Sequence, residues 1–301
     1  MTTPRTDKPT VAFIGLGIMG SPMAAKLCAA GLDVVGFSRT RAKDDALVAK
    51  GMRAADDVAS AVRDADVIIT MLPDSPDVES VALGSAGILA SATPGALFVD
   101  MSTIRPDTAR AVGAAAETRG LRFLDAPVSG GEQAAVDGTL SIMVGGPAES
   151  VAEATSVLAH VGTTIVHVGP VGAGQTVKAA NQLIVAGNIE LLAEALVFLE
   201  AQQVDTEKAI SVLEAGLAGS TVMARKARTM VARQFNPGFR IALHDKDLGI
   251  FTAAARTSRT ATPLGAVVAQ LVSTAHAQGD GDLDHSALFR LVERLSGHPT
   301  P

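Results

Sequence analysis

A glycine-rich segment near the start of the chain has the spacing of a loop that binds the pyrophosphate of a dinucleotide. Gly15-Leu16-Gly17-Ile18-Met19-Gly20 follows a predicted strand and opens a predicted helix. In that context the first glycine permits a tight turn, the second lets the backbone approach the pyrophosphate, and the third lets helix and strand pack closely. The N–H groups at the helix N-terminus would stabilise the phosphate charge. A glycine-rich turn without a ligand is the alternative.

The end of the second predicted strand distinguishes the two nicotinamide dinucleotides. A carboxylate there would bind the ribose 2′-hydroxyl, but this chain has Ser38-Arg39-Thr40. The Arg39 guanidinium can pair with a 2′-phosphate, and the two hydroxyls can donate hydrogen bonds to it. The segment therefore favours NADP and leaves NAD possible. The alternative is that Arg39 and Arg41 begin a solvated helix.

Two later segments carry groups that suit work on a small acid. Asp125–Gly131 (DAPVSGG) follows a predicted strand and offers the Ser129 hydroxyl with successive backbone N–H groups, which can bind a carboxylate. The segment Gly172–Gln182 places Lys178 and Asn181 on one face of a helix. Partial burial would lower the pKa of Lys178, which suits a residue that donates a proton. A simple tight turn, a surface lysine and a capping asparagine remain the alternatives.

The elements that must position these groups alternate in the first half of the chain. Apolar runs of strand length are separated by helical stretches, a pattern typical of a parallel sheet covered on both faces. After Gly174 one long helix, 176–202, leads into a helical region that continues to Leu295. We predict a disordered tail over 1–9, a Rossmann-type, doubly wound α/β domain over 10–172, and an all-helical domain over 173–301 that begins with a long interdomain helix. The predicted strands are Val11–Ile14, Val34–Phe37, Val67–Leu72, Leu97–Val99, Leu121–Leu124, Leu140–Val144 and Ile165–Val168.

Composition excludes several classes of protein. The chain has 31 acidic and 25 basic residues, and aromatic residues make up 3%, which argues against a nucleic-acid partner. It has no Tyr, so no tyrosine can serve as a catalytic acid. No Cys/His cluster has zinc spacing, so we predict no metal, and we interpret His244 as structural or cleft-lining.

Two further features bear on location and partners. The apolar stretch Leu183–Ala201 contains Glu190, Glu194 and Glu200, so we interpret it as a buried helix and predict no membrane partner. The N-terminal residues lack an apolar signal-peptide core, and the single cysteine, Cys28, fits a reducing compartment. We therefore expect a cytoplasmic protein. Its apolar helical half predicts a homodimer or homotetramer.

The segments GLGIMGSPMA, DAPVSGG and GAGQTVKAANQ, in this order, resemble the β-hydroxyacid dehydrogenases, the family of 3-hydroxyisobutyrate dehydrogenase. The resemblance runs from about Thr10 to Leu295 and implies a nicotinamide-dependent oxidoreductase. It implies that Lys178 protonates the developing alkoxide and that Asn181 holds the substrate oxygen beside it. The resemblance also implies that Ser129, Gly130 and Gly131 bind the substrate carboxylate. Thr103 would contact the cofactor near its nicotinamide, and Lys246 would contact substrate and cofactor as it closes the site. The remaining implied cofactor contacts are Gly15, Leu16, Gly17, Ile18, Met19, Gly20, Ser38, Arg39 and Thr40.

Four stretches are similar to the branch of the family that reduces tartronate semialdehyde to glycerate. They are Asp66–Pro76, Gly130–Thr139, Gly216–Val222 and Pro237–Leu248. The implied reaction is hydride transfer to a small carboxylated aldehyde. 3-Hydroxyisobutyrate, succinic semialdehyde and glyoxylate stay open as substrates of the same chemistry. A non-catalytic NADP-binding protein and an imine reductase are further alternatives, although an imine reductase usually lacks the lysine.

Overall fold

The computed structural model describes residues 8–297. The chain forms two compact units, Met1–Lys178 and Ala179–Pro301, which divide within one long helix. Residues 1–7 of the predicted tail lie outside the described residues. Lys8 is described, and its ammonium donates to the carbonyl oxygen of Ala30 at 3.0 Å.

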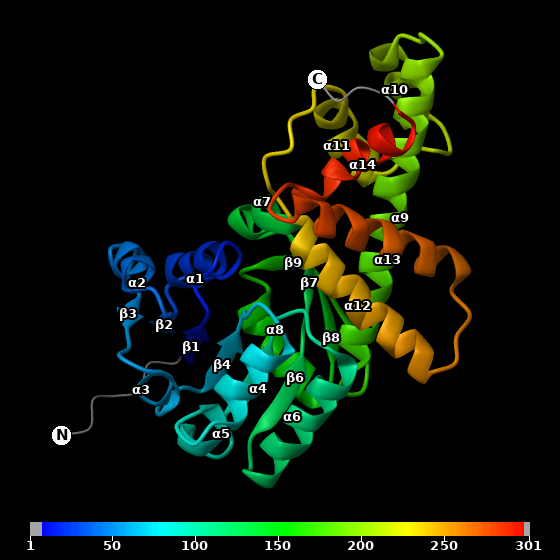
Figure 1. Ribbon diagram of the computed structural model, residues 1–301. Helices are drawn as coiled ribbons and strands as arrows, with labels where there is room; N and C mark the ends of the chain where they lie inside the picture. Colours follow the sequence, from blue (N-terminus) through cyan, green and yellow to red (C-terminus); the bar gives the residue numbers. More distant parts are fainter. Residues whose placement is uncertain (1–7, 298–301) are drawn as a thin grey trace, which may run out of the picture. The chain divides into compact units, whose positions relative to one another are not determined.

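Within the described residues, nine strands of the first unit form a single sheet (Figure 1). The order β3-β2-β1-β4-β5-β6 is parallel throughout. Strand β8 then runs antiparallel to β6 and β7, and β9 pairs parallel with β8. The strands are β1 (Thr10–Ile14), β2 (Asp33–Phe37), β3 (Arg53–Ala54), β4 (Val67–Thr70), β5 (Leu97–Asp100), β6 (Arg122–Asp125), β7 (Val128–Ser129), β8 (Leu140–Gly145) and β9 (Gly162–Gly169).

Helices cover both faces of this sheet, which is why its central strands are apolar on both sides. One apolar core joins the sheet to α1 (Gly20–Ala29), α2 (Arg41–Val48), α7 (Gly131–Asp137) and α8 (Ala148–Leu158). The core on the opposite face includes α3 (Val58–Val62), α4 (Ser75–Leu83), α5 (Ile88–Ser91) and α6 (Pro106–Thr118). The first unit is therefore a doubly wound, Rossmann-type α/β fold, as the sequence predicted.

Local departures from the predicted elements occur where polar contacts replace strand pairing. The predicted strand Val67–Leu72 ends at Thr70, because the N–H of Leu72 donates to the Ser102 hydroxyl at 2.9 Å. Ser129 was expected in a turn, but Val128 and Ser129 form the short strand β7 against β8. Two-residue strands such as β3 and β7 carry too little apolar pattern to be predicted.

The second unit consists of helices throughout its described part. It comprises the remainder of α9 (Ala173–Ala201), α10 (Thr206–Ala215), α11 (Thr221–Val231), α12 (Ile241–Thr257), α13 (Pro263–Ala275), an irregular turn at His276–Asp280 with Gly279 at a φ of 94°, a short 3₁₀ turn at His285–Ala287 and α14 (Leu288–Leu295). By length and composition alone, α9 is apolar enough to cross a membrane. One side of it, including Ala186, Ile189 and Ala193, is buried in the apolar core of this unit, as expected for a core helix.

Candidate active site

The glycine loop leaves the carboxyl end of β1, where ligands bind in open α/β sheets. Gly15 has a φ of 101°, and a Cβ there would collide with the backbone of Met71. A Cβ at Gly20 would collide with the carbonyl of Gly15, so the glycine lets α1 pack against the loop. A Cβ at Gly17 would meet nothing within 4 Å. The open side at Gly17 fits a group that approaches the backbone closely, as a pyrophosphate does.

The Ser38-Arg39-Thr40 segment begins beside this loop, because Ile14 pairs with Phe37 at the ends of β1 and β2. The Ser38 hydroxyl accepts from the Thr40 N–H at 3.2 Å and donates to the Thr40 carbonyl oxygen at 2.9 Å, which fixes a turn. The Arg39 side chain is 81% exposed and lies 3.7 Å from the Asp77 carboxylate. A 2′-phosphate can therefore reach Arg39, in competition with Asp77.

Asp125, the last residue of β6, holds the start of α9. Its Oδ1 accepts from the backbone N–H of Gly172 at 2.7 Å, and its Oδ2 accepts from that of Gln175 at 2.8 Å. Burial raises the pKa of Asp125 to about 7, while both N–H donors favour the ionised form. A Cβ at residue 174 would lie 2.7 Å from the Asp125 carbonyl oxygen, so the close approach requires Gly174. Asp125 thus fixes where α9 begins.

Gln175 joins this helix start to the loop that follows β5. Its Nε2 donates to the carbonyl oxygen of Ser102 at 2.8 Å, and its Oε1 accepts from the N–H of Ile104 at 3.1 Å. Both residues that flank Thr103 are therefore held by one buried side chain. Lys178 follows Gln175 by three positions on the same helix, so the loop that carries Thr103 and the lysine share one anchor.

Ser129 ends the short strand β7, opposite Ser141 of β8. Gly130 and Gly131 have φ values of 139° and 72°, which turn the chain from β7 into α7. Few other residue types adopt such backbone angles. The first unit thus places the glycine loop, Arg39 and Thr103 after the carboxyl ends of parallel strands, with Ser129 two strands further along the chain from β5.

Lys178 is 7% exposed, and it is the last residue of the first unit. Asn181 is partly buried and lies in the second unit, three residues further along the same continuous helix. Residues three apart on an α-helix share a face, so α9 aims both side chains in similar directions. An amine can donate a proton and an amide can donate a hydrogen bond, so both residue types suit contacts to a substrate oxygen.

The second unit joins Asn181 to Lys246 through two buried residues whose roles the sequence did not indicate. Asn181 Nδ2 donates to Gln182 Oε1 at 2.8 Å, and Gln182 Nε2 donates to Asp247 Oδ2 at 2.6 Å. Asp247 Oδ1 then lies 3.0 Å from Lys246 Nζ. Both predicted site residues of this unit are therefore anchored by Gln182 and Asp247.

His244 is fully buried, one turn before Leu248 on α12. Its Nε2 lies 3.0 Å from the Gln182 carbonyl oxygen, which only accepts, so Nε2 carries the proton. Its Nδ1 then accepts from His285 Nδ1 at 3.1 Å. Burial and the neighbouring His244 lower the pKa of His285 to about 3, so the His285 ring is neutral near pH 7. His244 is thus held between Gln182 and His285, whereas the carboxylate of Asp245 accepts from His276 Nδ1 at 2.8 Å.

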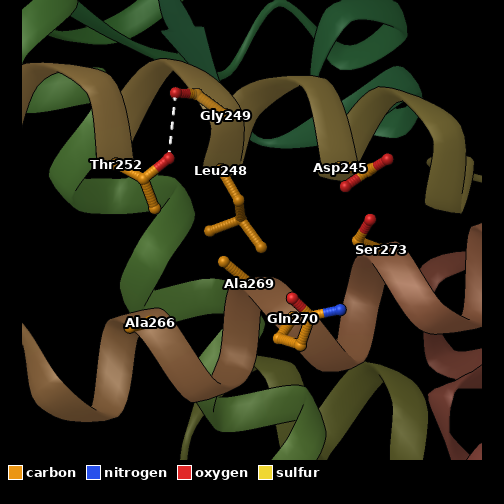
Figure 2. A pocket seen from close by; sticks show the side chains of 8 residues that line it. All are labelled: Asp245, Leu248, Gly249, Thr252, Ala266, Ala269, Gln270 and Ser273. Atoms are coloured by element: carbon orange, nitrogen blue, oxygen red, sulfur yellow. Dashed lines mark hydrogen bonds between the residues drawn. The ribbon is translucent and has the colours of Figure 1, made fainter.

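A groove of about 300 Å³ runs between α12 and α13 in the second unit (Figure 2). Its α12 side is formed by Asp245, Leu248, Gly249 and Thr252, which recur at helical spacing. At about 100° per residue, Asp247 points about 100–160° away from each of them around the helix axis. The groove therefore lies on a different side of α12 from the residues that anchor Lys246.

Comparison with known proteins agrees with this architecture. Residues 10–169 match the NAD binding domain of 6-phosphogluconate dehydrogenase, and residues 172–292 match the NAD-binding family of NADP-dependent 3-hydroxyisobutyrate dehydrogenase. The 2-hydroxy-3-oxopropionate reductase of Escherichia coli strain K12 is 40% identical over 96% of this chain and 98% of its own. The NAD-dependent L-serine dehydrogenase of Pseudomonas aeruginosa is 37% identical over 95% and 99% of the two chains.

A solved structure of 3-hydroxyisobutyrate dehydrogenase from Mycobacterium tuberculosis with L-serine has a TM-score of 0.87. It is 35% identical to this chain and covers 95% of it and 99% of its own length. The fold and the matched sequences define an NAD(P)-dependent oxidoreductase. The chain belongs to the β-hydroxyacid dehydrogenase family, whose members act on varied small substrates.

Proposed function

We propose that the protein reduces a small carboxylated aldehyde, tartronate semialdehyde, to glycerate with NADPH. The observation that carries this proposal is the Gln175 side chain, which fixes the backbone on both sides of Thr103 from the helix that bears Lys178. A cofactor-contacting loop and a proton donor held by one buried anchor are what reduction of a carbonyl requires. The 40% identity to an Escherichia coli enzyme named 2-hydroxy-3-oxopropionate reductase supports the substrate.

In this proposal each residue has a separate task. The glycine loop and Arg39 hold the dinucleotide, which when bound supplies the hydride for the carbonyl carbon. Ser129, Gly130 and Gly131 bind the substrate carboxylate. Lys178 Nζ donates a proton to the carbonyl oxygen as it becomes an alkoxide, and Asn181 donates a hydrogen bond to the same oxygen. Lys246 and Thr103 complete the contacts to substrate and cofactor.

Partners and location form part of the same proposal. The exposed apolar side chains on α9 support a homo-oligomer, either a dimer or a tetramer. The single cysteine supports a reducing, cytoplasmic location.

Initial rates with purified protein test the reaction. NADPH oxidation is followed with tartronate semialdehyde, succinic semialdehyde, methylmalonate semialdehyde and glyoxylate, and NADP⁺ reduction with L-serine and 3-hydroxyisobutyrate. We expect the highest kcat/KM with tartronate semialdehyde. Propanal, which lacks the carboxylate, is the control and should react at least about 10-fold less efficiently, the loss expected for one charge-assisted contact. A higher kcat/KM with another member of the panel would reassign the substrate, and no turnover of any would overturn the enzymatic proposal.

A further inference from the structure

The buried carboxylate of Asp284 joins three segments of the second unit. Both of its oxygens accept from the Lys226 ammonium on α11, at 2.8 and 2.9 Å. Its Oδ2 also accepts from the backbone N–H groups of Gly238 and Phe239, at 3.0 and 3.1 Å. Its Oδ1 accepts from the N–H and the hydroxyl of Ser286, at 3.1 and 2.6 Å. A buried carboxylate with this many donors fixes the segments that donate to it.

One of these segments, residues 235–240, leads directly into α12. Two backbone hydrogen bonds hold it as well: the N–H of Asp284 donates to the Phe235 carbonyl oxygen at 3.0 Å, and the N–H of His285 donates to that of Phe239 at 2.8 Å. Lys246 lies in the second turn of α12. The contacts of Asp284 therefore fix the start of the helix that carries Lys246.

Three rings pack where this segment meets α12. The centroid of the Phe239 ring lies 5.6 Å from that of His244 and 5.5 Å from that of His285, edge to face in both pairs. The two imidazole centroids are 5.1 Å apart. Edge-to-face contacts favour particular ring orientations. The position of Phe239, which Asp284 holds by its backbone, thus influences how both imidazoles are oriented.

The two imidazoles connect this cluster to α9. His244 Nε2 donates to the Gln182 carbonyl oxygen at 3.0 Å, and His244 Nδ1 lies 3.1 Å from His285 Nδ1. In the Nε2–H tautomer of His244, Nδ1 is an acceptor, and the Nδ1–H of His285 satisfies it. Because His244 is fully buried, an unsatisfied Nδ1 would favour another ring orientation. His285 therefore holds the ring that ties α12 to Gln182.

We propose that Asp284 and His285 are positioning residues for Asn181 and Lys246. Asp284 holds the segment that leads into α12, and His285 orients the His244 ring that ties α12 to α9. The inference rests on the proposed function, since Asn181 and Lys246 have their roles in that reaction. Neither Asp284 nor His285 acts on the substrate; both act through the helices that carry the other two residues.

Two substitutions of His285 separate its hydrogen bond from its packing. His285→Asn keeps an N–H group on Cγ, where Nδ1 of the imidazole is attached, and can still donate to His244. His285→Phe keeps a ring against Phe239 but has no donor. We expect kcat of His285→Phe to be at least about 10-fold below that of His285→Asn, because misplaced groups contribute less to the transition state.

Steady-state kinetics and fluorescence titration of NADPH measure this difference at a temperature where circular dichroism shows both variants to be folded. The dissociation constant for NADPH should change much less than kcat, because the glycine loop and Arg39 lie in the first unit. A packing role predicts the reverse order, since Phe fills the space of an imidazole better than Asn does. A kcat of His285→Phe equal to or above that of His285→Asn would overturn the proposal.

Nitrogen NMR of protein with isotope-labelled histidine tests the same hydrogen bonds without turnover. Near neutral pH, His244 should be protonated at Nε2, with an Nδ1 signal typical of a hydrogen-bonded acceptor; His244→Gln identifies these signals by their loss. The Nδ1 signal should persist in His285→Asn and move in His285→Phe. A wild-type ring protonated at Nδ1, or an Nδ1 signal unchanged in His285→Phe, would contradict the proposal. A wild type that shows the expected signals but reduces no carbonyl would overturn only the proposed function.

Asp284→Asn tests the carboxylate. The amide nitrogen cannot accept from the N–H groups of Gly238 and Phe239, so kcat should fall by at least about 10-fold and the His244 Nδ1 signal should move. Asp280→Asn is the matched control, because it alters a buried carboxylate of the same unit that pairs with two arginines. If Asp284→Asn leaves the His244 signal in place, or Asp280→Asn moves it equally, Asp284 does not position the cluster. Where Asp284→Asn fails to fold, the two His285 variants still decide the outcome.

Discussion

Gln182 Nε2 donates to Asp247 Oδ2 at 2.6 Å, between two buried residues that are 65 positions apart in the chain. Through this bond, Asn181 and Lys246 receive a common anchor, since Gln182 Oε1 accepts from Asn181 and Asp247 Oδ1 faces Lys246. The His244 ring adds a second tie between the same helices, at the Gln182 carbonyl oxygen. Gln182 and Asp247 are therefore positioning residues for the proposed chemistry of their neighbours.

Replacing Gln182 tests this role. Gln182→Leu should lower kcat by about 10- to 100-fold, because Asn181 and Lys246 lose their shared anchor and misplaced groups contribute less to the transition state. The dissociation constant for NADPH should change much less than kcat, because the glycine loop and Arg39, which hold most of the dinucleotide in this proposal, lie in the first unit. Asp280→Asn is the matched control: it disturbs a buried carboxylate of the same unit that pairs with Arg290 and Arg294. Equal losses of kcat in both variants would show that Gln182 stabilises the second unit and does not specifically position Asn181 and Lys246.

Replacing Lys178 tests the proton donor. Lys178→Ala should reduce kcat by about 10²–10⁴-fold, the usual contribution of a general acid, with NADPH binding nearly unchanged. Lys50→Ala, at an exposed lysine of the same unit, should keep wild-type rates. Steady-state kinetics and fluorescence titration of NADPH measure the two effects. A Lys178→Ala enzyme that retained more than about a tenth of the wild-type kcat would remove the lysine from the mechanism.

The proposed preference for NADPH rests on Arg39, whose guanidinium lies 3.7 Å from the Asp77 carboxylate. We expect a higher kcat/KM with NADPH than with NADH in the wild type. Arg39→Ala should lower the NADPH value by about 10-fold, since the guanidinium is largely exposed and its pairing is screened. Asp77→Asn should raise the NADPH value, because it frees Arg39 from a competing carboxylate. A wild type that prefers NADH would contradict this assignment and leave the fold and family unaffected.

The buried carboxyl of Glu190 predicts a pH-dependent stability. Burial, with a smaller effect from Glu194, raises its pKa from 4.5 to about 7. In the unfolded chain the group ionises near pH 4.5, but in the folded chain it keeps its proton until about 7. Below pH 4.5 the group is protonated in both states and does not change the free energy of unfolding. As the pH rises from 4.5 to about 7, the free energy of unfolding falls, and above pH 7 it stays at the lower value.

Glu190→Gln, which stays neutral, should remove this loss. The free energy of unfolding of the variant should match the wild type near pH 4 and exceed it by up to about 3 kcal/mol at pH 8. Urea unfolding across the pH range measures the difference. Glu194→Gln is the control, because its exposed carboxyl should change stability much less. A difference that stays constant with pH would show that Glu190 does not titrate in this way.

The local sequence was sufficient for the fold class and for most elements. Apolar runs such as Val67–Thr70 are buried on both faces, as is typical of the strands of a parallel sheet between two layers of helices. The G-x-G-x-x-G spacing likewise predicted the glycine loop after β1, because the backbone conformation of that loop depends on six consecutive residues. The short strand at Ser129 escaped prediction, since its pairing with Ser141 depends on a distant strand.

The anchors of the candidate site were decided by the tertiary structure alone. Gln175 and Asp125 are separated by 50 positions and Gln182 and Asp247 by 65, so no local pattern marks either pair. Their side chains matter because the fold buries them, and a buried amide or carboxylate must find a partner across the chain. Sequence spacing therefore identified the candidate site residues, whereas burial and long-range hydrogen bonds, which depend on the tertiary structure, determined which residues hold them in place.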